Sequence, residues 1–316
     1  MIARFRLRTW AALLVTLAVN VLPATAQNTA AIRLAVFPTD SYGEAYYAQD
    51  MGFFKEHGID VEFTVNNAGA VALAAVAGSA VDIGVANPVT VAQAYAKGVP
   101  VAIIAGGGMY TSASPATLLV VPKNSSLRSA KDLEGKTIGL PGLGDQLQAA
   151  MSLWLQKNGA DPAKVKYVEV NPPPIMQAAL AQGRVDAATP PEPTLTLALA
   201  NDARIFGDPF AAVAPRFFIG IYIARSDWIK ANPDLAKRFV AAIYEAARWA
   251  NTHHDESAAI LAKYSKGDAA VLRTMRRATY AESDDARMIQ PPIDAAFKTG
   301  LMTTAVNAND LLAKLP

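Results

Sequence analysis

The sequence predicts an α/β protein with mainly parallel strands, divided into two lobes of related build. From Ala31 onward, short apolar runs alternate with helical stretches, as in strands joined by helical crossovers. Residues 70–84 and 175–188 share one pattern, an alanine-rich helix, a glycine and then Val-Asp opening a strand. Because a left-handed residue is favoured after a helix, glycines are expected to end the helices. These glycines are Gly58, Gly78, Gly98, Gly159 and Gly183.

The individual elements follow from hydrophobic patterning between turn residues. Strands are predicted over Ile32–Phe37, Val61–Val65, Ile83–Ala86, Val101–Ala105, Leu118–Val121, Thr137–Leu140, Val165–Glu169 and Ile219–Ala224. Helices are predicted between them over Ala45–Glu56, Val71–Ala77, Thr90–Lys97, Gln146–Asn158 and Ile175–Gln182.

The chain after Ala224 is predicted to be mostly helical, over Pro233–Thr252, Glu256–Tyr264, Asp268–Thr279 and Asp285–Lys298. Such a helical tail must pack on something already formed, and the economical arrangement returns it to the first lobe. The prediction is therefore a discontinuous first lobe, residues 27–119 and 225–316, and a second lobe, residues 120–224.

The first 26 residues are typical of an export signal. Three arginines precede an apolar run, Trp10–Leu22, and a small-residue stretch, Ala24–Ala26, follows it. That run is shorter than the roughly 20 residues that a membrane-spanning helix needs, which disfavours the alternative of a permanent anchor. We expect cleavage after Ala26 and a mature protein that is free in the periplasm.

Composition excludes several classes of function. The chain has a formal net charge of +2, and the leader contributes three arginines and no acid, so the mature chain is close to neutral. Without a basic excess, nucleic-acid binding has no electrostatic support. The absence of cysteine excludes disulfides, thiol nucleophiles, thiolate metal sites and a lipid anchor on cysteine. The three histidines lack the i, i+4 spacing of a zinc-binding helix, so no metal site is predicted.

Four segments carry a family pattern. They are Tyr46–Phe54 with Gly58–Glu62 after it, Gly78–Gly84, Lys131–Gly139, and Ala178–Ala187 followed by Glu192–Pro193. In this order, behind an export signal, they resemble the periplasmic solute-binding proteins of ABC importers, in the group named for nitrate, sulfonate, taurine and thiamine-precursor uptake. The resemblance runs from about Ile32 to the final helices.

The resemblance implies a type II periplasmic binding protein fold, with two Rossmann-like lobes joined by a two-segment hinge near Leu119–Pro122 and Phe217–Ala224. It implies a monomer without cofactors that closes on a small organic solute, a sulfonate, carboxylate or heterocycle, and delivers it to an ABC transporter permease in the inner membrane. Two alternatives share this fold: a thiamine-pyrimidine synthase-like enzyme and a ligand-sensing domain for a membrane receptor. The synthase relies on a cysteine-rich motif inside cells, so a leader and no cysteine favour the binding protein.

Ligand contacts are expected in the loops that follow the carboxyl ends of the strands, because ligands of open parallel sheets bind there. The candidates are Thr39, Asp40, Tyr42, Asn87, Thr90, Tyr110, Thr111, Ser112, Gly142, Gly144, Asp145, Gln146 and Glu192. Helix N-termini in these loops favour an anionic group on the solute. If Asp40 or Glu44 faces inward, the solute carries a hydrogen-bond donor or a cationic amine as well.

Several candidates also have a purely structural interpretation, and both interpretations stay open. Gly142–Gly144 fits the backbone demand of a tight turn, and Asp145 fits a helix N-cap. Asn87 fits a strand end before Pro88, and Glu192 fits a pairing within the second lobe. Tyr46 and Tyr47 are adjacent on one helix, so at least one of them is expected in the core.

Overall fold

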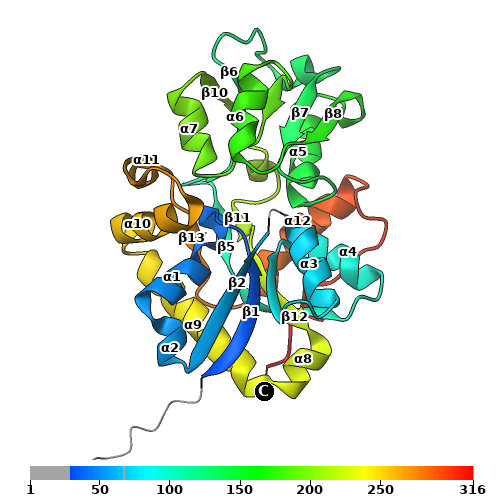
Figure 1. Ribbon diagram of the computed structural model, residues 1–316. Helices are drawn as coiled ribbons and strands as arrows, with labels where there is room; N and C mark the ends of the chain where they lie inside the picture. Colours follow the sequence, from blue (N-terminus) through cyan, green and yellow to red (C-terminus); the bar gives the residue numbers. More distant parts are fainter. Residues whose placement is uncertain (1–28, 67, 316) are drawn as a thin grey trace, which may run out of the picture.

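The computed structural model describes residues 29–66 and 68–315, in which two five-stranded sheets form the centres of two α/β lobes (Figure 1). The first sheet has the order β2-β1-β3-β12-β4. Its strands are β1 (Ala30–Val36), β2 (Ile59–Val65), β3 (Ile83–Ala86), β4 (Val101–Gly106) and β12 (Ile221–Arg225). The second sheet has the order β10-β6-β9-β7-β8. Its strands are β6 (Leu119–Pro122), β7 (Thr137–Leu140), β8 (Lys166–Glu169), β9 (Ala187–Ala188) and β10 (Ala203–Gly207).

Alternating side chains explain how the first sheet is covered on both faces. Ile32, Leu34 and Val36 of β1 pack in one core cluster, whereas Ala35 packs in the cluster on the other side. The helices of this part of the chain are α1 (Gly43–Met51), α2 (Phe53–Glu56), α3 (Gly69–Ala77) and α4 (Pro88–Ala96), with a 3-10 turn, η1 (Asp40–Tyr42). Residues of α1 join the first cluster and residues of α3 and α4 join the second.

The second sheet is covered in the same way. Val121 of β6 packs in one cluster with residues of α5, whereas Val120 packs in another with residues of α6 and α7. The helices of this part are α5 (Gln146–Lys157), α6 (Pro174–Ala181) and α7 (Thr194–Ala200), with 3-10 turns η2 (Ala130–Leu133), η3 (Pro162–Lys164) and η4 (Phe210–Ala212). The fold class predicted from the sequence is confirmed.

Each sheet contains a strand that runs against its parallel neighbours. In the first sheet, β12 is antiparallel to β3 and β4; in the second, β6 is antiparallel to β9 and β10. These are the strands by which the chain enters one sheet after leaving the other. A third, small sheet of β11 (Arg216–Phe218), β5 (Gly108–Thr111) and β13 (Thr279–Tyr280) lies beside the crossings. The predicted division at Ala224 assigns Ile221–Ala224 to the second lobe, but β12 pairs within the first sheet.

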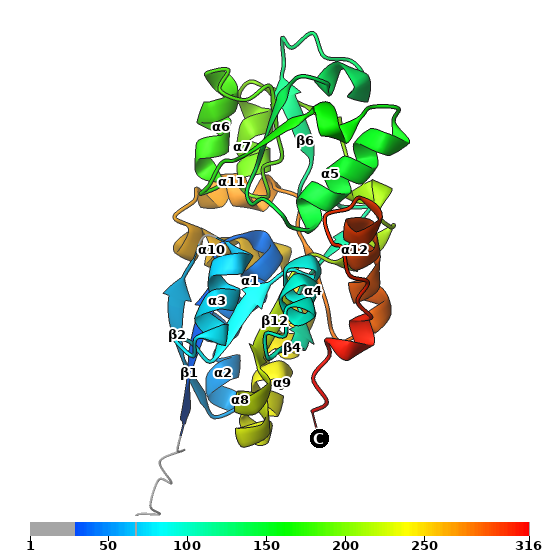
Figure 2. The same ribbon diagram turned by 90° about the vertical axis from the view of Figure 1, so that its right-hand side faces the viewer.

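The C-terminal helices lie against both halves of the molecule (Figure 2). They are α8 (Ser226–Ala231), α9 (Pro233–Ala250), α10 (His254–Ser265), α11 (Ala269–Thr274) and α12 (Ala286–Lys298), followed by η5 (Ala308–Asp310). The helices α9 and α10 pack on α1, while α12 contacts α4 of the first lobe and α5 of the second. The helix α11 contacts α7 of the second lobe. The tail thus covers the first lobe and also reaches across the gap between the sheets.

Two local predictions are corrected. The helix expected over Ala45–Glu56 is interrupted, because Gly52 takes a left-handed conformation (φ +87°) that ends α1 before α2 begins. At the end of α3, Gly78 is not left-handed (φ −84°); the next residue, Ser79, takes that conformation instead (φ +59°). The predicted export signal lies outside the described residues, and none of the described helices is both long and apolar enough to cross a bilayer.

Candidate functional site

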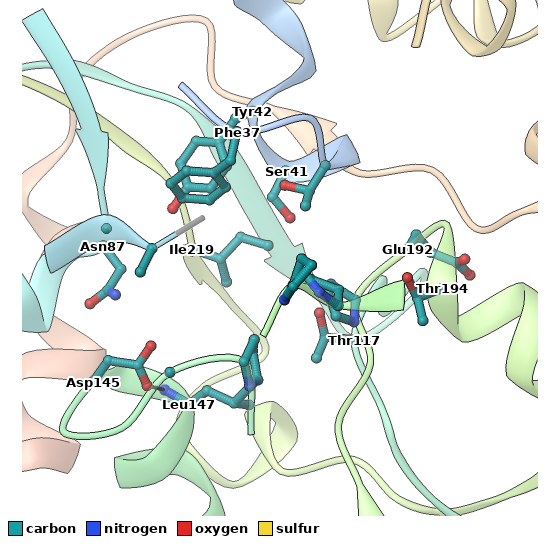
Figure 3. A pocket seen from close by; sticks show the side chains of 18 of the residues that line it. Phe37, Ser41, Tyr42, Asn87, Thr117, Asp145, Leu147, Glu192, Thr194 and Ile219 are labelled. Atoms are coloured by element: carbon teal, nitrogen blue, oxygen red, sulfur yellow. Dashed lines mark hydrogen bonds between the residues drawn. The ribbon is translucent and has the colours of Figure 1, made fainter. Parts of the chain in front are cut away.

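A cavity of about 320 Å³ is lined by loops from both lobes (Figure 3). Phe37 and Asn87 directly follow β1 and β3 of the first sheet. Gly142 follows β7 in the second sheet, and Glu192 follows β9. The cavity therefore lies where the carboxyl ends of both sets of parallel strands face each other, as the loop rule predicts.

An aromatic pair forms the first-lobe wall of the cavity. The rings of Phe37 and Tyr42 meet edge to face, with centroids 4.2 Å apart, and overlap in the view of Figure 3. The Tyr42 hydroxyl donates to the Ala86 carbonyl oxygen at 3.1 Å, which fixes the ring. Burial raises the pKa of Tyr42, so the hydroxyl stays protonated. This wall can cover a flat or apolar part of a solute.

Two helix N-termini point at the cavity, and each is capped by a side chain that lines it. Asn87 Oδ1 accepts from the Thr90 N–H at 3.0 Å and caps α4. Asp145 Oδ1 accepts from the Leu147 and Gln148 N–H groups at 3.0 and 3.3 Å and caps α5. Burial, and to a smaller extent the charge of Glu169, raise the pKa of Asp145 to about 6, against the lowering effect of its backbone hydrogen bonds. The cap predicted at Asp145 is thus present, Asn87 forms a second cap that was not predicted, and both residues also line the cavity.

The Glu192 side chain lines the cavity and accepts hydrogen bonds from α7 and from the C-terminal segment. Its side chain is 1% exposed. One oxygen accepts from the Thr196 N–H at 3.0 Å, and the other from the Thr196 hydroxyl at 2.9 Å and the Arg276 N–H at 3.3 Å. Burial raises the pKa of Glu192, and these hydrogen bonds oppose the rise. The carboxyl group therefore ties the second lobe to the segment between α11 and β13.

Gln146 contributes a fixed hydrogen-bond acceptor. The side chain is 5% exposed, and its Nε2 donates to the Ile219 carbonyl oxygen at 2.8 Å. Since that bond requires the amide nitrogen to face Ile219, the orientation of the amide is set. The Oε1 atom is buried and has no hydrogen-bond partner among the described residues.

The charge of the cavity wall is negative. Asp145, Glu169 and Glu192 line it, and none of the described residues in the lining is lysine, arginine or histidine. Among the described residues, in the cavity or elsewhere, no group of three or more histidine, aspartate or glutamate side chains is arranged to hold a metal ion.

The structure places eight of the predicted contact residues in the lining and five outside it. Those in the lining are Thr39, Tyr42, Asn87, Thr90, Gly142, Asp145, Gln146 and Glu192. Their role in binding stays a prediction. Sequence reasoning did not name Phe37 or Glu169, although both end predicted strands, and the same loop rule points to them. Thr117 and Phe210 also line the cavity, and no local signal marks them.

The other five predicted residues have different surroundings. Asp40 is 1% exposed and binds the Arg277 guanidinium at 3.0 Å. Tyr110 lies in the second-lobe core and donates to Asp208 at 2.8 Å. Thr111 pairs with Arg216 in the small sheet, and Ser112 is exposed.

The fifth, Gly144, joins the two lobes. Its carbonyl oxygen accepts from Gln93 Nε2 of α4 at 3.0 Å.

Tyr46 and Tyr47, which are adjacent on α1, are both buried in the core of the first lobe. The sequence predicted that at least one of them would lie in the core.

Comparison with known proteins supports the sequence resemblance. The taurine-binding periplasmic protein of Escherichia coli (strain K12) is 29% identical over 223 residues, which are 68% of this chain and 66% of that protein. The alkanesulfonate-binding protein SsuA from Xanthomonas axonopodis pv. citri, solved with bound MOPS, has the same fold. Its TM-score is 0.74 at 19% identity, over 90% of this chain and 99% of that one.

The fold is shared by an enzyme as well. The desulfurization enzyme DSZB has a TM-score of 0.65 at 15% identity, over 90% of this chain and 96% of that chain. The fold alone therefore does not separate binding from catalysis. The family model described as NMT1/THI5 like matches residues 41–257, more than half of the chain. The chain therefore belongs to the NMT1/THI5-like family, as its sequence motifs predicted.

Proposed function

We propose that this protein is the periplasmic binding component of an ABC importer and captures a small organic solute between its two lobes. The observation that carries the proposal is the shared lining of the cavity, with Phe37, Tyr42 and Asn87 from the first lobe and Asp145 and Glu192 from the second. A volume of about 320 Å³ suits a compact solute. The taurine-binding relative supports this function over the synthase-like alternative.

The proposed mechanism is hinge closure about the two crossings. The chain leaves the first lobe between β5 and β6 and returns between β10 and β11. The predicted division into residues 27–119 with 225–316 and residues 120–224 is part of this proposal, except that Ile221–Ala224 belong with the first lobe, because β12 pairs in the first sheet.

Closure requires the solute to contact both lobes. A ligand shifts a conformational equilibrium only through a difference in its affinity for the two states. A solute held by Asp145 alone would leave the lobes where they are, whereas one that also packs on Phe37 and Tyr42 stabilises the closed form. At a concentration of 100 times its Kd, such a solute adds about 2.7 kcal/mol to the free energy of unfolding.

The test uses the chain from residue 27 onward, purified and incubated with sulfonates, carboxylates, amines and pyrimidines. We expect at least one compound to raise the melting temperature and to reduce the radius of gyration in small-angle scattering. Recovery of that compound unchanged after long incubation separates binding from catalysis. Chemical conversion of the compound, or stabilisation without compaction, would contradict the proposal.

A further inference from the structure

The chemistry of the cavity wall indicates which kind of solute it accepts. We propose that the solute carries a cationic nitrogen, an ammonium or amidinium group, bound by Asp145, Glu169 and the Gln146 carbonyl oxygen. This inference rests on the proposed function and specifies its substrate class. It sets the cavity apart from an anion site, although helix N-termini line it.

The first argument is that the chain already fills those N-termini with its own side chains. Asp145 occupies the first turn of α5, and Asn87 that of α4. At α7 the same place is taken by the Glu192 carboxylate. The helix α6 begins after Pro172 and Pro173 with Pro174, and proline has no N–H to offer an anion.

The second argument is electrostatic. An anion in the cavity would face Asp145, Glu169 and Glu192 with no basic side chain from the described lining to pair with it. A buried charge without a partner is strongly disfavoured. A cation placed between Asp145 and Glu169 offsets their mutual repulsion, which adds to burial in raising the pKa of Asp145.

The third argument concerns acceptors that await a donor. Both capping bonds of Asp145 go to Oδ1, so Oδ2 can accept a hydrogen bond from a solute. Gln146 also lines the cavity, and its Oε1 is buried without a partner among the described residues. A buried acceptor without a donor is costly, and an N–H of the solute would satisfy it. An anion such as a sulfonate offers no such donor.

The apolar wall completes the recognition. Phe37 and Tyr42 lie opposite Asp145 across the cavity (Figure 3). A cationic group attached to a flat or aliphatic body would bind the second-lobe carboxylates with its charge and the first-lobe rings with its body. The same rings attract a cation through their π faces. The solute would thus contact both lobes, which hinge closure requires.

The experiment compares solutes of matched shape and different charge on the chain from residue 27 onward. Pairs such as benzamidine and benzoate, or butylamine and butanesulfonate, are ranked by thermal shift, and affinities are measured by calorimetry. We expect the cation of each pair to bind more tightly. Tighter binding of the anion, with compaction, would overturn the charge assignment and leave the proposed function standing. If no compound of any charge binds, the proposed function fails and the charge assignment falls with it.

Variants locate the charge. Asp145→Asn keeps the helix cap, since asparagine caps as well as aspartate, and removes the negative charge. We expect it to weaken the tightest cation about ten- to hundred-fold, the usual effect of losing a hydrogen bond to a charged group. Glu169→Gln should weaken it in the same direction. Asp202→Asn, an exposed change of equal charge in the same lobe, is the matched control. Equal affinities in Asp145→Asn, Glu169→Gln and the control would refute the assignment.

Discussion

Replacing Asp40 by asparagine tests whether the role of this residue is structural, as an ion-pair partner of Arg277 outside the cavity lining. Its Oδ1 accepts from Arg277 Nη2 at 3.0 Å, from Arg277 Nε at 3.2 Å and from the Tyr280 hydroxyl at 2.9 Å. Its Oδ2 accepts from the Ala278 N–H. Both oxygens therefore face donors. An asparagine NH₂ in either orientation would face a donor, and the charge that pairs with Arg277 would be lost.

The expected cost follows from burial of the pair. The Arg277 side chain is 9% exposed and that of Asp40 1% exposed. Breaking a buried ion pair by removing one partner costs about 3–5 kcal/mol, because the remaining charge is buried without compensation. A domain has about 5–15 kcal/mol of stability in total. We therefore expect Asp40→Asn to lower the melting temperature by roughly 6 °C or more.

The assay is urea and thermal unfolding of the chain from residue 27 onward, with two comparisons. Arg277→Met should cost a similar amount, and the double variant should cost less than the sum of the two, since neither charge is then left alone. Asp50→Asn is the control, because its ion pair with Lys263 at 2.8 Å is exposed (62% for the lysine) and worth about 1 kcal/mol or less. If Asp40→Asn loses no more stability than Asp50→Asn, the structural role of Asp40 is refuted.

Three further predictions follow from the site. As the pH falls from 7.5 to 5, the affinity for a cationic solute should fall about tenfold, because the Asp145 carboxyl has a pKa of about 6 and must be ionised to bind a cation. Calorimetry across this pH range checks the prediction, and constant affinity would contradict it. Gly108→Ala should lower the free energy of unfolding by about 1–3 kcal/mol in urea and weaken solute binding, because a Cβ would lie 2.4 Å from the Ser41 carbonyl oxygen beside the cavity. Unchanged stability would count against this close packing. Gln93→Ala removes the hydrogen bond to Gly144, which joins the two lobes and on our proposal favours the closed form. It should weaken solute binding about fivefold and change the free energy of unfolding of the free protein little. Equal affinity would show that this bond does not favour the closed form.

Much of the site could be predicted because it obeys a local rule. Asn87, Gly142 and Asp145 follow strands whose apolar runs stand out in the sequence, and the ends of parallel strands meet at one edge of a sheet. The capping roles of Asn87 and Asp145 are likewise local, since each cap bonds within three residues of itself.

The remaining placements depend on contacts between segments far apart in the chain. Asp40 sits in a predicted loop, but Arg277 turns it away from the cavity, and Arg277 lies in a C-terminal segment whose packing no local pattern specifies. Tyr110 was expected at the rim because it follows β4, yet Phe210 and Phe217 enclose its ring in the second-lobe core.

The sequence by itself determined the α/β class, the family and the strand ends that form the cavity, because periodicity, glycines and caps act over a few residues. Only the tertiary structure decided how segments far apart in the chain shape the cavity. The strand β12 returns to the first sheet, and Asp40 forms an ion pair with Arg277. Asp145, Glu169 and Gln146 converge at the cavity without a basic partner from the described lining. These side chains converge because loops far apart in the sequence pack against one another. The burial and the charge of the cavity depend on all of these loops, so no single segment of the sequence predicts them.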